Sequence, residues 1–375
     1  SSQFKDSRHS FTTAPFHSAS ELPSAMRSTR SLALLVLPSL FARALSAAHV
    51  TCAADDKGAS TGNQWIQGRA TLKAAFVKRP LPQGYADLVR GQRQRVNTSE
   101  LVSLPLSGPP DVKKELFIYG YPVEEDRVVS GSVLKRGSWE GDGVKQICEP
   151  FQQNPGKGFN FLDVGGNIGT ITLPVAALLE QTGGRVFTVE AMPSIGEHLK
   201  AGIVENGLRN VDLYSYAVSD PIAKDDLVMA RHPTNKGASA VVGNKDWTTT
   251  STQMTRVQLT TLDAMLGQEP GLRRVLVAKM DIEGHEGRAL QGARRLLREA
   301  APCYMMIELH ASWLESAGTP IQDVVRQLAD AGYDTRQISL SGVQTYWLKQ
   351  VDMKGCLARL VAAGGPAVSL ALPPP

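Results

Sequence analysis

The sequence is poor in cysteine and lacks the clustered pairs that zinc sites and disulfide scaffolds need. Its four cysteines, Cys52, Cys148, Cys303 and Cys356, are spread over 375 residues, which excludes a CxxC-type zinc cluster and a dense disulfide framework. It also lacks a block of Lys and Arg, and its net charge is only +4. Nucleic acid is therefore not an expected partner, and no metal centre is expected.

The overall composition is that of an ordinary globular protein. Hydrophobic residues make up 42% and charged residues 20% of the chain, which excludes the collagen-like, wholly disordered and coiled-coil classes. The length suits one large domain or two modest ones.

The segment around the first methionine has the three parts of a secretory signal. Met26 to Arg30 is basic, Leu32 to Phe41 is mostly apolar, and small residues follow up to Ala48. The apolar run is too short to span a bilayer of ~30 Å. We therefore expect residues 1–48 to consist of translated sequence upstream of Met26, followed by a cleaved signal peptide or a signal anchor. The expected location is the ER or Golgi lumen or the extracellular space. The alternative is a plastid or mitochondrial transit peptide, and membrane contact is expected only if the segment stays uncleaved.

Three further regions differ in pattern. Residues 49–114 show no sustained period and are expected to form a stem or linker, with one helix near Trp65–Val77. Residues 115–350 are expected to form the functional domain. The last stretch, 351–375, ends in an Ala, Gly and Pro-rich sequence and is expected to be a flexible tail.

Short apolar runs alternate with helical patterns inside the expected domain. We expect strands at 159–164, 185–190, 211–218, 275–281 and 304–309, and helices at 171–179, 193–206, around 289–297 and at 319–332. Such alternation indicates right-handed crossovers and a parallel sheet covered on both faces. The predicted fold class is α/β, with a doubly wound, mostly parallel, Rossmann-like sheet and helices on both faces.

The first expected strand ends in a glycine-rich turn, D-V-G-G-N-I-G, from Asp163 to Gly169. Ligands of doubly wound sheets bind at the carboxyl ends of the strands. The second strand ends there in Glu190, whose carboxylate can accept both hydroxyls of an adenosine ribose. The turn has no G-x-G-x-x-G register, and Asp163 would repel a pyrophosphate but suits the two cationic groups of S-adenosylmethionine. The charges favour this methyl donor over NAD.

Several motifs resemble those of the FkbM-type methyltransferases, class I enzymes that use S-adenosylmethionine. The turn resembles their first motif, which usually has Ala in place of Gly166, and Val189 to Pro193 resembles the second-strand motif. The most specific signature, K-x-D-x-E-G-x-E, is matched by Lys279 to Glu286, with Ile307 to His310 following. The resemblance covers about 126–348. It implies an extra antiparallel strand, a bound methyl donor and transfer to an oxygen of a sugar or other small molecule.

The motifs supply the candidate site residues. The expected donor-binding residues are Asp163, Gly165, Gly166, Asn167, Gly169, Glu190, Asp220 and Asp281. The expected catalytic residues are Asp281, Glu283 and His310, because a hydroxyl acceptor needs a base within hydrogen-bond reach. The expected acceptor-binding residues are His285, Glu286 and Glu308, and the long connection Arg231–Thr255 is expected to cover the acceptor.

Several of these residues have a structural alternative. Asp163 can cap the following helix, while Glu283 and Glu286 can pair with Arg288 or Lys279 or stabilise a helix N-terminus. His285 and His310 can each be a structural residue whose ring nitrogens are hydrogen-bonded within the protein. The pair Trp139-Glu140 can cover the donor or seal the core.

The sequence thus predicts an S-adenosylmethionine-dependent O-methyltransferase acting on a small-molecule or glycan hydroxyl. Two alternatives remain open at this point: an NAD(P)-dependent oxidoreductase, and a non-catalytic relative of the methyltransferase fold.

Overall fold

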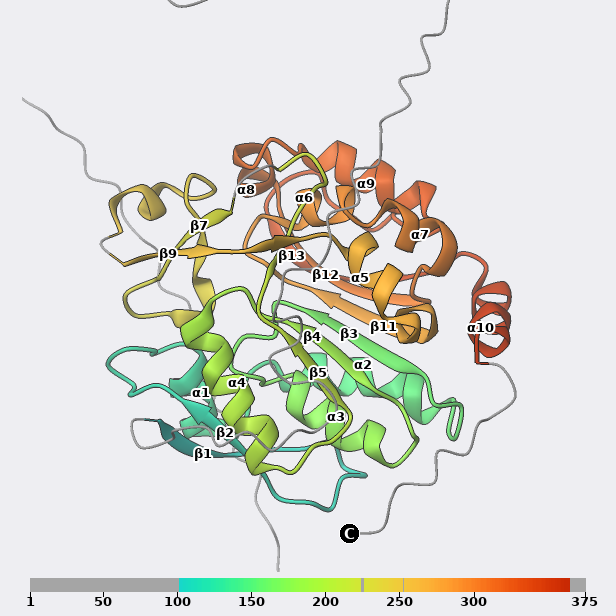
Figure 1. Ribbon diagram of the computed structural model, residues 1–375, viewed down its shortest axis with the longest axis horizontal. Coiled ribbons are helices and arrows are strands. Elements are labelled where there is room, and N and C mark those ends of the chain that lie inside the picture. Colours follow the sequence, from blue (N-terminus) through green and yellow to red (C-terminus); the bar gives the residue numbers. More distant parts are fainter. Residues whose placement is uncertain (1–100, 224–225, 252, 365–375) are drawn as a thin grey trace, which may run out of the picture. The chain divides into compact units, whose positions relative to one another are not determined.

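The computed structural model describes residues 101–223, 226–251 and 253–364 (Figure 1). The expected signal segment, the possible helix near Trp65–Val77 and the last residues, 365–375, lie outside these ranges, so the expectations for them stay predictions.

A six-stranded sheet with the order β13-β12-β11-β3-β4-β5 forms the centre of the described chain. The strands are β3 (Asn160–Val164), β4 (Val186–Val189), β5 (Val211–Tyr214), β11 (Val275–Met280), β12 (Tyr304–His310) and β13 (Val343–Lys349). All neighbours are parallel except β13, which is antiparallel to β12. The predicted fold class and the extra antiparallel strand are confirmed. Since β3 has β4 on one side and β11 on the other, the strand order reverses at β3, where such sheets bind ligands.

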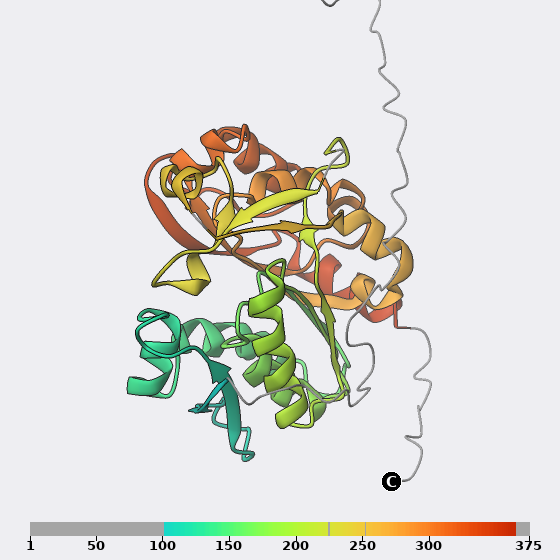
Figure 2. The same cartoon turned by 60° about the vertical axis from the view of Figure 1, so that its left-hand side comes forward.

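Two separate hydrophobic clusters fill the two faces of this sheet because successive strand residues alternate in direction. Phe161 and Val277 belong to one cluster, and their neighbours Leu162 and Ala278 belong to the other. The first cluster is covered by α1 (Val129–Arg136), α2 (Gly141–Gln152), α3 (Thr172–Glu180), α4 (Pro193–Glu205) and α10 (Met353–Ala362). The second is covered by α5 (Leu262–Gln268), α6 (Glu286–Gln291), α7 (Arg294–Ala300), α8 (Ala311–Ser316) and α9 (Ile321–Asp330). Helices therefore lie on both faces, as predicted (Figures 1 and 2).

Three small sheets surround the central one. β1 (Val102–Leu106) pairs with β2 (Leu116–Gly120), β6 (Ala217–Val218) pairs with β10 (Leu259–Thr260), and β7 (Leu227–Ala230) lies between β8 (Ala240–Val241) and β9 (Met254–Val257). The short 3-10 helices are η1 (Lys236–Ala238), η2 (Asp246–Thr250) and η3 (Pro270–Arg274).

The expected linker and the expected third strand both differ from the structure. The linker range contains β1, because Leu104 and Leu106 alternate into the core and are each 5% exposed. The single strand expected at 211–218 is two strands, since the chain leaves the central sheet after Tyr214 and Ala217 pairs with Leu259 instead.

The helix expected around 289–297 is divided into α6 and α7. The Asp263 carboxylate accepts hydrogen bonds from the backbone N–H groups of Arg295 and Leu296, at 2.9 and 2.8 Å. These are groups that the first turn of a helix leaves unpaired. A separate α7 therefore starts where the apolar period alone suggests one continuous helix.

The expected flexible tail begins with an ordered helix. The Asp352 side chain caps α10 by accepting a hydrogen bond from the Gly355 N–H at 2.8 Å. A disulfide between Cys303 and Cys356 fastens this helix to the chain before β12, and Leu360 is fully buried. The tail expectation therefore fails for 353–362. Within the described ranges, no helix is long and apolar enough to cross a membrane.

Candidate active site

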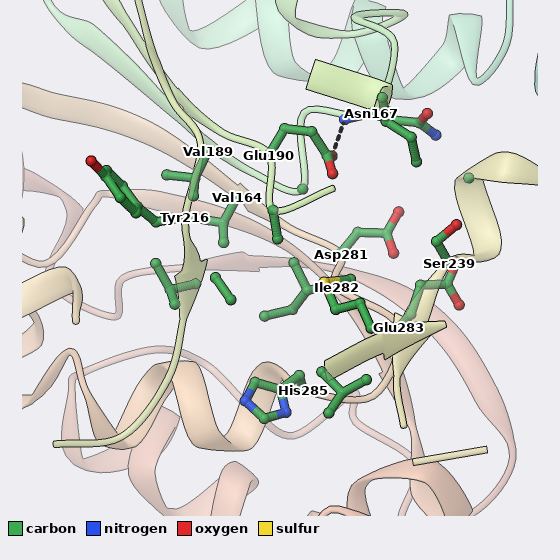
Figure 3. Close-up of a pocket in the computed structure, with 18 of the residues that line it drawn as sticks. Val164, Asn167, Val189, Glu190, Tyr216, Ser239, Asp281, Ile282, Glu283 and His285 are labelled. Atoms are coloured by element: carbon green, nitrogen blue, oxygen red, sulfur yellow. Dashed lines mark hydrogen bonds between the residues drawn. The ribbon is translucent and has the colours of Figure 1, made fainter. Parts of the chain in front are cut away.

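A pocket of about 660 Å³ opens at the carboxyl ends of β3, β4 and β11, at the reversal of strand order (Figure 3). Four segments supply its lining: the glycine-rich turn, the end of β4, the β5–β6 chain with the small sheet after it, and the turn after β11. The lining residues are Val164, Gly165, Asn167, Val189, Glu190, Ala191, Ile195, Tyr216, Ala217, Val218, Met229, Gly237, Ser239, Val241, Lys279, Asp281, Ile282, Glu283 and His285.

The glycine-rich turn needs a glycine where it passes the chain after β11. Gly165 has φ +92°, and a Cβ there would lie 2.0 Å from the Asp281 carbonyl oxygen. Asn167, with φ +49°, donates its backbone N–H to the Glu190 carboxylate at 2.9 Å, so the turn and the end of β4 are joined (Figure 3).

The other two expected glycines, Gly166 and Gly169, do not line the pocket. A Cβ on Gly166 would lie 2.3 Å from the Thr188 hydroxyl, and one on Gly169 would lie 2.7 Å from Leu199. Both glycines allow close packing of the turn against β4 and α4, which is a structural role.

Glu190 points into the pocket from the end of β4 (Figure 3). Its two carboxylate oxygens accept hydrogen bonds from the backbone N–H groups of Met192, at 2.8 Å, and Asn167, at 2.9 Å. Burial raises the pKa of this carboxyl to about 7, although the two N–H groups act in the opposite direction. Each carboxylate oxygen keeps a lone pair for a further donor, so the group can accept ribose hydroxyls.

Lys279 lines the pocket, whereas the sequence suggested it only as a partner for acids. Its ammonium is buried, donates to the Gly165 carbonyl at 2.8 Å, and lies 3.8 Å from Asp163 and 3.5 Å from Asp281. Burial alone would lower the pKa of Lys279, but the acids Asp281, Asp163 and Glu140 together raise it. The lysine is therefore charged, and its position two residues before Asp281 in a strand was the available signal, because alternation places both side chains on one face.

Asp163 was expected to contact the methyl donor, but it does not line the pocket. It is fully buried, accepts a hydrogen bond from the Thr172 hydroxyl at 2.6 Å, and pairs with Lys279. Burial raises the pKa of this carboxyl. Its contacts join the first residue of α3 to the lysine, but it does not cap the helix, because no side chain accepts from the free backbone N–H groups of α3.

Acids gather at the end of β11. Asp281 and Glu283 both line the pocket, and Glu283 forms an ion pair with the buried Lys245. Glu308 on β12 lies beside Asp281, because it directly follows Ile307, the strand partner of Met280, but it does not line the pocket. Burial, reinforced by the nearby carboxylates, raises the pKa of Glu308 to about 8. Glu308 therefore holds a proton near neutral pH and can donate it to Asp281.

His285 lines the pocket below Ile282 and is held on both ring nitrogens (Figure 3). Nε2 lies 3.0 Å from the Ser219 hydroxyl, and Nδ1 lies 3.4 Å from the Asn244 amide. Burial lowers the pKa of this histidine to about 4, so the ring is neutral and serves as a hydrogen-bonding wall.

Three other expected site residues lie outside the pocket lining. The buried Glu286 accepts hydrogen bonds from the N–H groups of Ile282 and Gly284, at 2.8 and 3.2 Å, and so shapes the turn after β11. Asp220 pairs with Arg288 at 3.1 Å instead of facing a ligand. His310 stacks on Trp313, with the ring centroids 3.8 Å apart.

The long connection Arg231–Thr255 contributes Gly237, Ser239 and Val241 to the pocket lining, while its expected role in covering the acceptor stays a prediction. The same segment carries Lys245, whose ammonium lies 3.4 Å from the centre of the Trp313 ring. Sequence analysis missed Lys245 because its partners are far away along the chain. Trp139 packs against the hydrophobic core and does not line the pocket.

The lining fits S-adenosylmethionine in its chemistry. Apolar side chains around Tyr216 suit an adenine ring, Glu190 suits the ribose, and the carboxylates of Asp281 and Glu283 suit the donor's cationic groups. In the part of the chain that the structure describes, no group of three or more His, Cys, Asp or Glu residues could hold a metal ion.

Comparison with known families identifies residues 163–335 as matching the model of the methyltransferase FkbM domain. This match confirms the family inferred from the motifs and favours a methyl donor over a nicotinamide cofactor. A comparison with curated proteins found no match.

Several solved structures resemble the chain at low identity. A methyltransferase FkbM from Methylobacillus flagellatus KT is 17% identical, with a TM-score of 0.31 over 51% of this chain and 44% of that one. The chain thus spans less than half of that protein's length. An O-methyltransferase from Bacillus cereus in complex with SAH is 13% identical, with a TM-score of 0.35 over 60% of this chain and 87% of that one. A SAM-dependent methyltransferase from Aquifex aeolicus is 15% identical, with a TM-score of 0.29 over 57% of this chain and 100% of that one.

Proposed function

Since residues 163–335 are an FkbM domain of the S-adenosylmethionine-dependent methyltransferases, we propose that the chain transfers the donor's methyl group to a hydroxyl oxygen of a small molecule or glycan. The observation that carries the choice of oxygen is the row of acids at the end of β11. Asp281 and Glu283 line the pocket, and Glu308 lies beside Asp281 on the neighbouring strand. A neutral hydroxyl must lose its proton as it is methylated, and this site is rich in groups that accept one.

The donor is held by the glycine-rich turn and the end of β4. Gly165 and Asn167 line the pocket at this turn and would contact the donor there, and Glu190 would accept hydrogen bonds from its ribose. The bound donor supplies an electrophilic methyl group on a positively charged sulfur. The chain's own contribution is to align the acceptor oxygen with that methyl group, which accounts for much of the acceleration in such displacements.

Asp281 is the residue to which we assign the proton. When the acceptor oxygen is methylated, an Asp281 carboxylate oxygen would accept the proton that the hydroxyl loses. Glu308 acts as a positioning residue beside Asp281, since its raised pKa keeps it protonated, and so uncharged, near neutral pH. His310 has no part in this scheme because it lies outside the pocket.

We also propose that the chain acts in the secretory pathway. The Cys303–Cys356 disulfide supports this location, because disulfides persist in oxidising compartments and are rare in the cytosol. Import into a plastid or mitochondrion is the competing outcome, and fractionation of a tagged full-length chain in a eukaryotic host separates the two.

The function is tested by incubating the purified chain with S-adenosylmethionine and a panel of sugars, oligosaccharides, polyols, phenols and amines. We expect S-adenosylhomocysteine to form with hydroxyl compounds and the product to be a methyl ether by mass spectrometry. Methylation of nitrogen or carbon would overturn the choice of oxygen. Failure to bind S-adenosylhomocysteine in calorimetry would overturn the donor assignment.

A further inference from the structure

A second hollow, larger than the donor pocket, lies beside the N-terminal end of α2. With the open space at the mouth included, its volume is about 1660 Å³, against about 660 Å³ for the donor pocket. The chain after β1, the end of α1, the first turns of α2 and strands β12 and β13 supply its lining. These residues, which we call the α2 groove, are Ser107, Gly108, Pro109, Pro110, Arg136, Ser138, Glu140, Gly141, Asp142, Gly143, Val144, Lys145, Gln146, Thr170, Met306 and Thr345.

The strand register places the floor of the α2 groove beside the reacting end of the donor pocket. Met306 is the β12 partner of Lys279, and Thr345 is the β13 partner of Glu308. Glu308 directly follows Ile307, the β12 partner of Met280, so it lies beside Asp281. A continuous row of side chains on one face of the sheet therefore leads from Thr345 in the groove through Glu308 to Asp281 in the pocket.

Glu140 lies between the α2 groove and the donor pocket. It lines the groove, and its carboxyl interacts electrostatically with Lys279 and Asp281, which line the pocket. Its backbone has φ +56°, a conformation that is uncommon for a residue other than glycine and that is concentrated at functional sites. Thr170 provides a second link, because it directly follows the glycine-rich turn.

The chemistry of the α2 groove is neutral and hydrogen-bonding. The two basic side chains, Arg136 and Lys145, are balanced by two acidic ones, Glu140 and Asp142, and Lys145 and Asp142 already form an ion pair at 2.9 Å. An anionic ligand would need a surplus of positive charge, and a wholly apolar ligand would leave unpaired the polar groups that stand beside the apolar Pro109, Pro110, Val144 and Met306. The groove instead offers hydroxyl and amide groups, from Ser107, Ser138, Thr170, Thr345 and Gln146.

We propose that the α2 groove binds an extended, neutral, polyhydroxylated chain, an oligosaccharide, and presents one of its hydroxyls to Asp281. This assignment rests on the proposed function for the methylation step but not for binding itself. The groove contacts units beyond the reacting one, so affinity rises with the number of sugar units.

The test measures binding of a series of neutral oligosaccharides of increasing length to the full chain in the presence of S-adenosylhomocysteine. Thr345→Leu and Gln146→Leu each remove a polar group and add bulk, on the strand floor and on the helical wall of the groove. Gln344→Leu is the matched control, because this neighbour of Thr345 alternates to the other face of β13. We expect both groove variants to bind the oligosaccharide about tenfold more weakly, which is the effect of losing one good hydrogen-bonding group. The control should bind it as the wild type does. The affinity for S-adenosylhomocysteine should be unchanged in all three variants.

Three results would overturn the assignment: no binding of any neutral oligosaccharide, equal loss in the groove variants and the control, or binding only of acidic glycans or peptides. Oligosaccharide binding without methylation would support the groove and count against the proposed function. Methylation of small alcohols with no oligosaccharide binding would support the proposed function and count against the groove.

Discussion

The Lys279 ammonium donates a hydrogen bond to the Gly165 carbonyl at 2.8 Å, which ties β11 directly to the glycine-rich turn. The same ammonium lies between Asp163 and Asp281. One buried cation therefore sets the positions of the donor-binding turn and of the acid to which we assign the proton.

Replacing Lys279 with Met should reduce the free energy of unfolding by about 3–5 kcal/mol, because it leaves a buried carboxylate without its cation. Denaturant titration measures the change, with Lys145→Met as the control, since that lysine side chain is 69% exposed. Asp163→Asn should cost less in the Lys279→Met background than in the wild type. An unchanged denaturation midpoint in Lys279→Met would show that the network contributes nothing to stability.

Replacing Glu190 with Gln should weaken stabilisation by S-adenosylhomocysteine. A ligand at a hundredfold excess over Kd stabilises the folded state by ~2.7 kcal/mol, and the variant loses the charged acceptor for the ribose hydroxyls. Thermal melts with and without the ligand measure the difference. Glu197→Gln on α4 is the control, because its side chain is 57% exposed. Equal ligand-induced shifts in both variants would remove Glu190 from the site.

Stability should fall as the pH rises from about 4.5 toward 7. Burial raises the pKa of Glu190 and of Glu286 from 4.5 to about 7 in the folded chain. In this window the folded state binds more protons than the unfolded state, so raising the pH favours unfolding. Denaturant titrations across the window should show a shallower decline for Glu286→Gln than for the wild type. A wild-type stability that rises through the whole window would contradict this assignment.

Asp281→Asn should lower kcat by roughly 10²–10⁴-fold, the range for loss of a general base. Glu283→Gln should instead mainly reduce stability, since it leaves the buried Lys245 without its partner. His310→Ala should leave kcat near the wild-type value. Single-turnover methyl transfer, with donor affinity measured separately by calorimetry, distinguishes the three. A larger kcat loss in Glu283→Gln than in Asp281→Asn would move the proton acceptor to Glu283.

Reduction of the Cys303–Cys356 bond should destabilise the chain. The bond joins residues separated by 53 positions, and the loop-entropy relation gives about 4 kcal/mol for a loop of that length. Melting with and without a reductant measures the effect. The Cys303→Ala and Cys356→Ala double variant should melt lower and should no longer respond to the reductant. A reductant response that persists in this variant would assign the effect to another group.

Much of the fold could be predicted because its elements have strong local signals. The parallel strands around Phe161 and Val277 are short apolar runs closed by turns, and α9 shows a clear helical period. The division between α6 and α7 could not be predicted, because it depends on Asp263, a residue distant in sequence. The end of β5 at Tyr214 likewise depends on pairing with β10, which no local pattern reveals.

The candidate site was predicted best where a residue follows directly on a strand. Glu190 and Asp281 reach the pocket for that reason, and Glu283 lies in the turn that follows Asp281. Asp163 lies inside β3 and Glu286 begins α6, and their carboxylates satisfy buried groups of the chain instead. Position at a strand end indicates proximity to the site, while side-chain direction and the available partners decide whether a residue faces the ligand.

The close approach of Gly166 to Thr188 makes these two positions a single unit for substitution. A methyl group at 166 would meet the Thr188 hydroxyl at 2.3 Å and Leu199 at 2.9 Å, so the alanine that is usual at this motif position fits only if residue 188 is smaller. An engineer who restores the consensus alanine here must therefore exchange Thr188 in the same step. In homologous chains the two residues should vary together, with glycine at the first accompanying a larger side chain at the second.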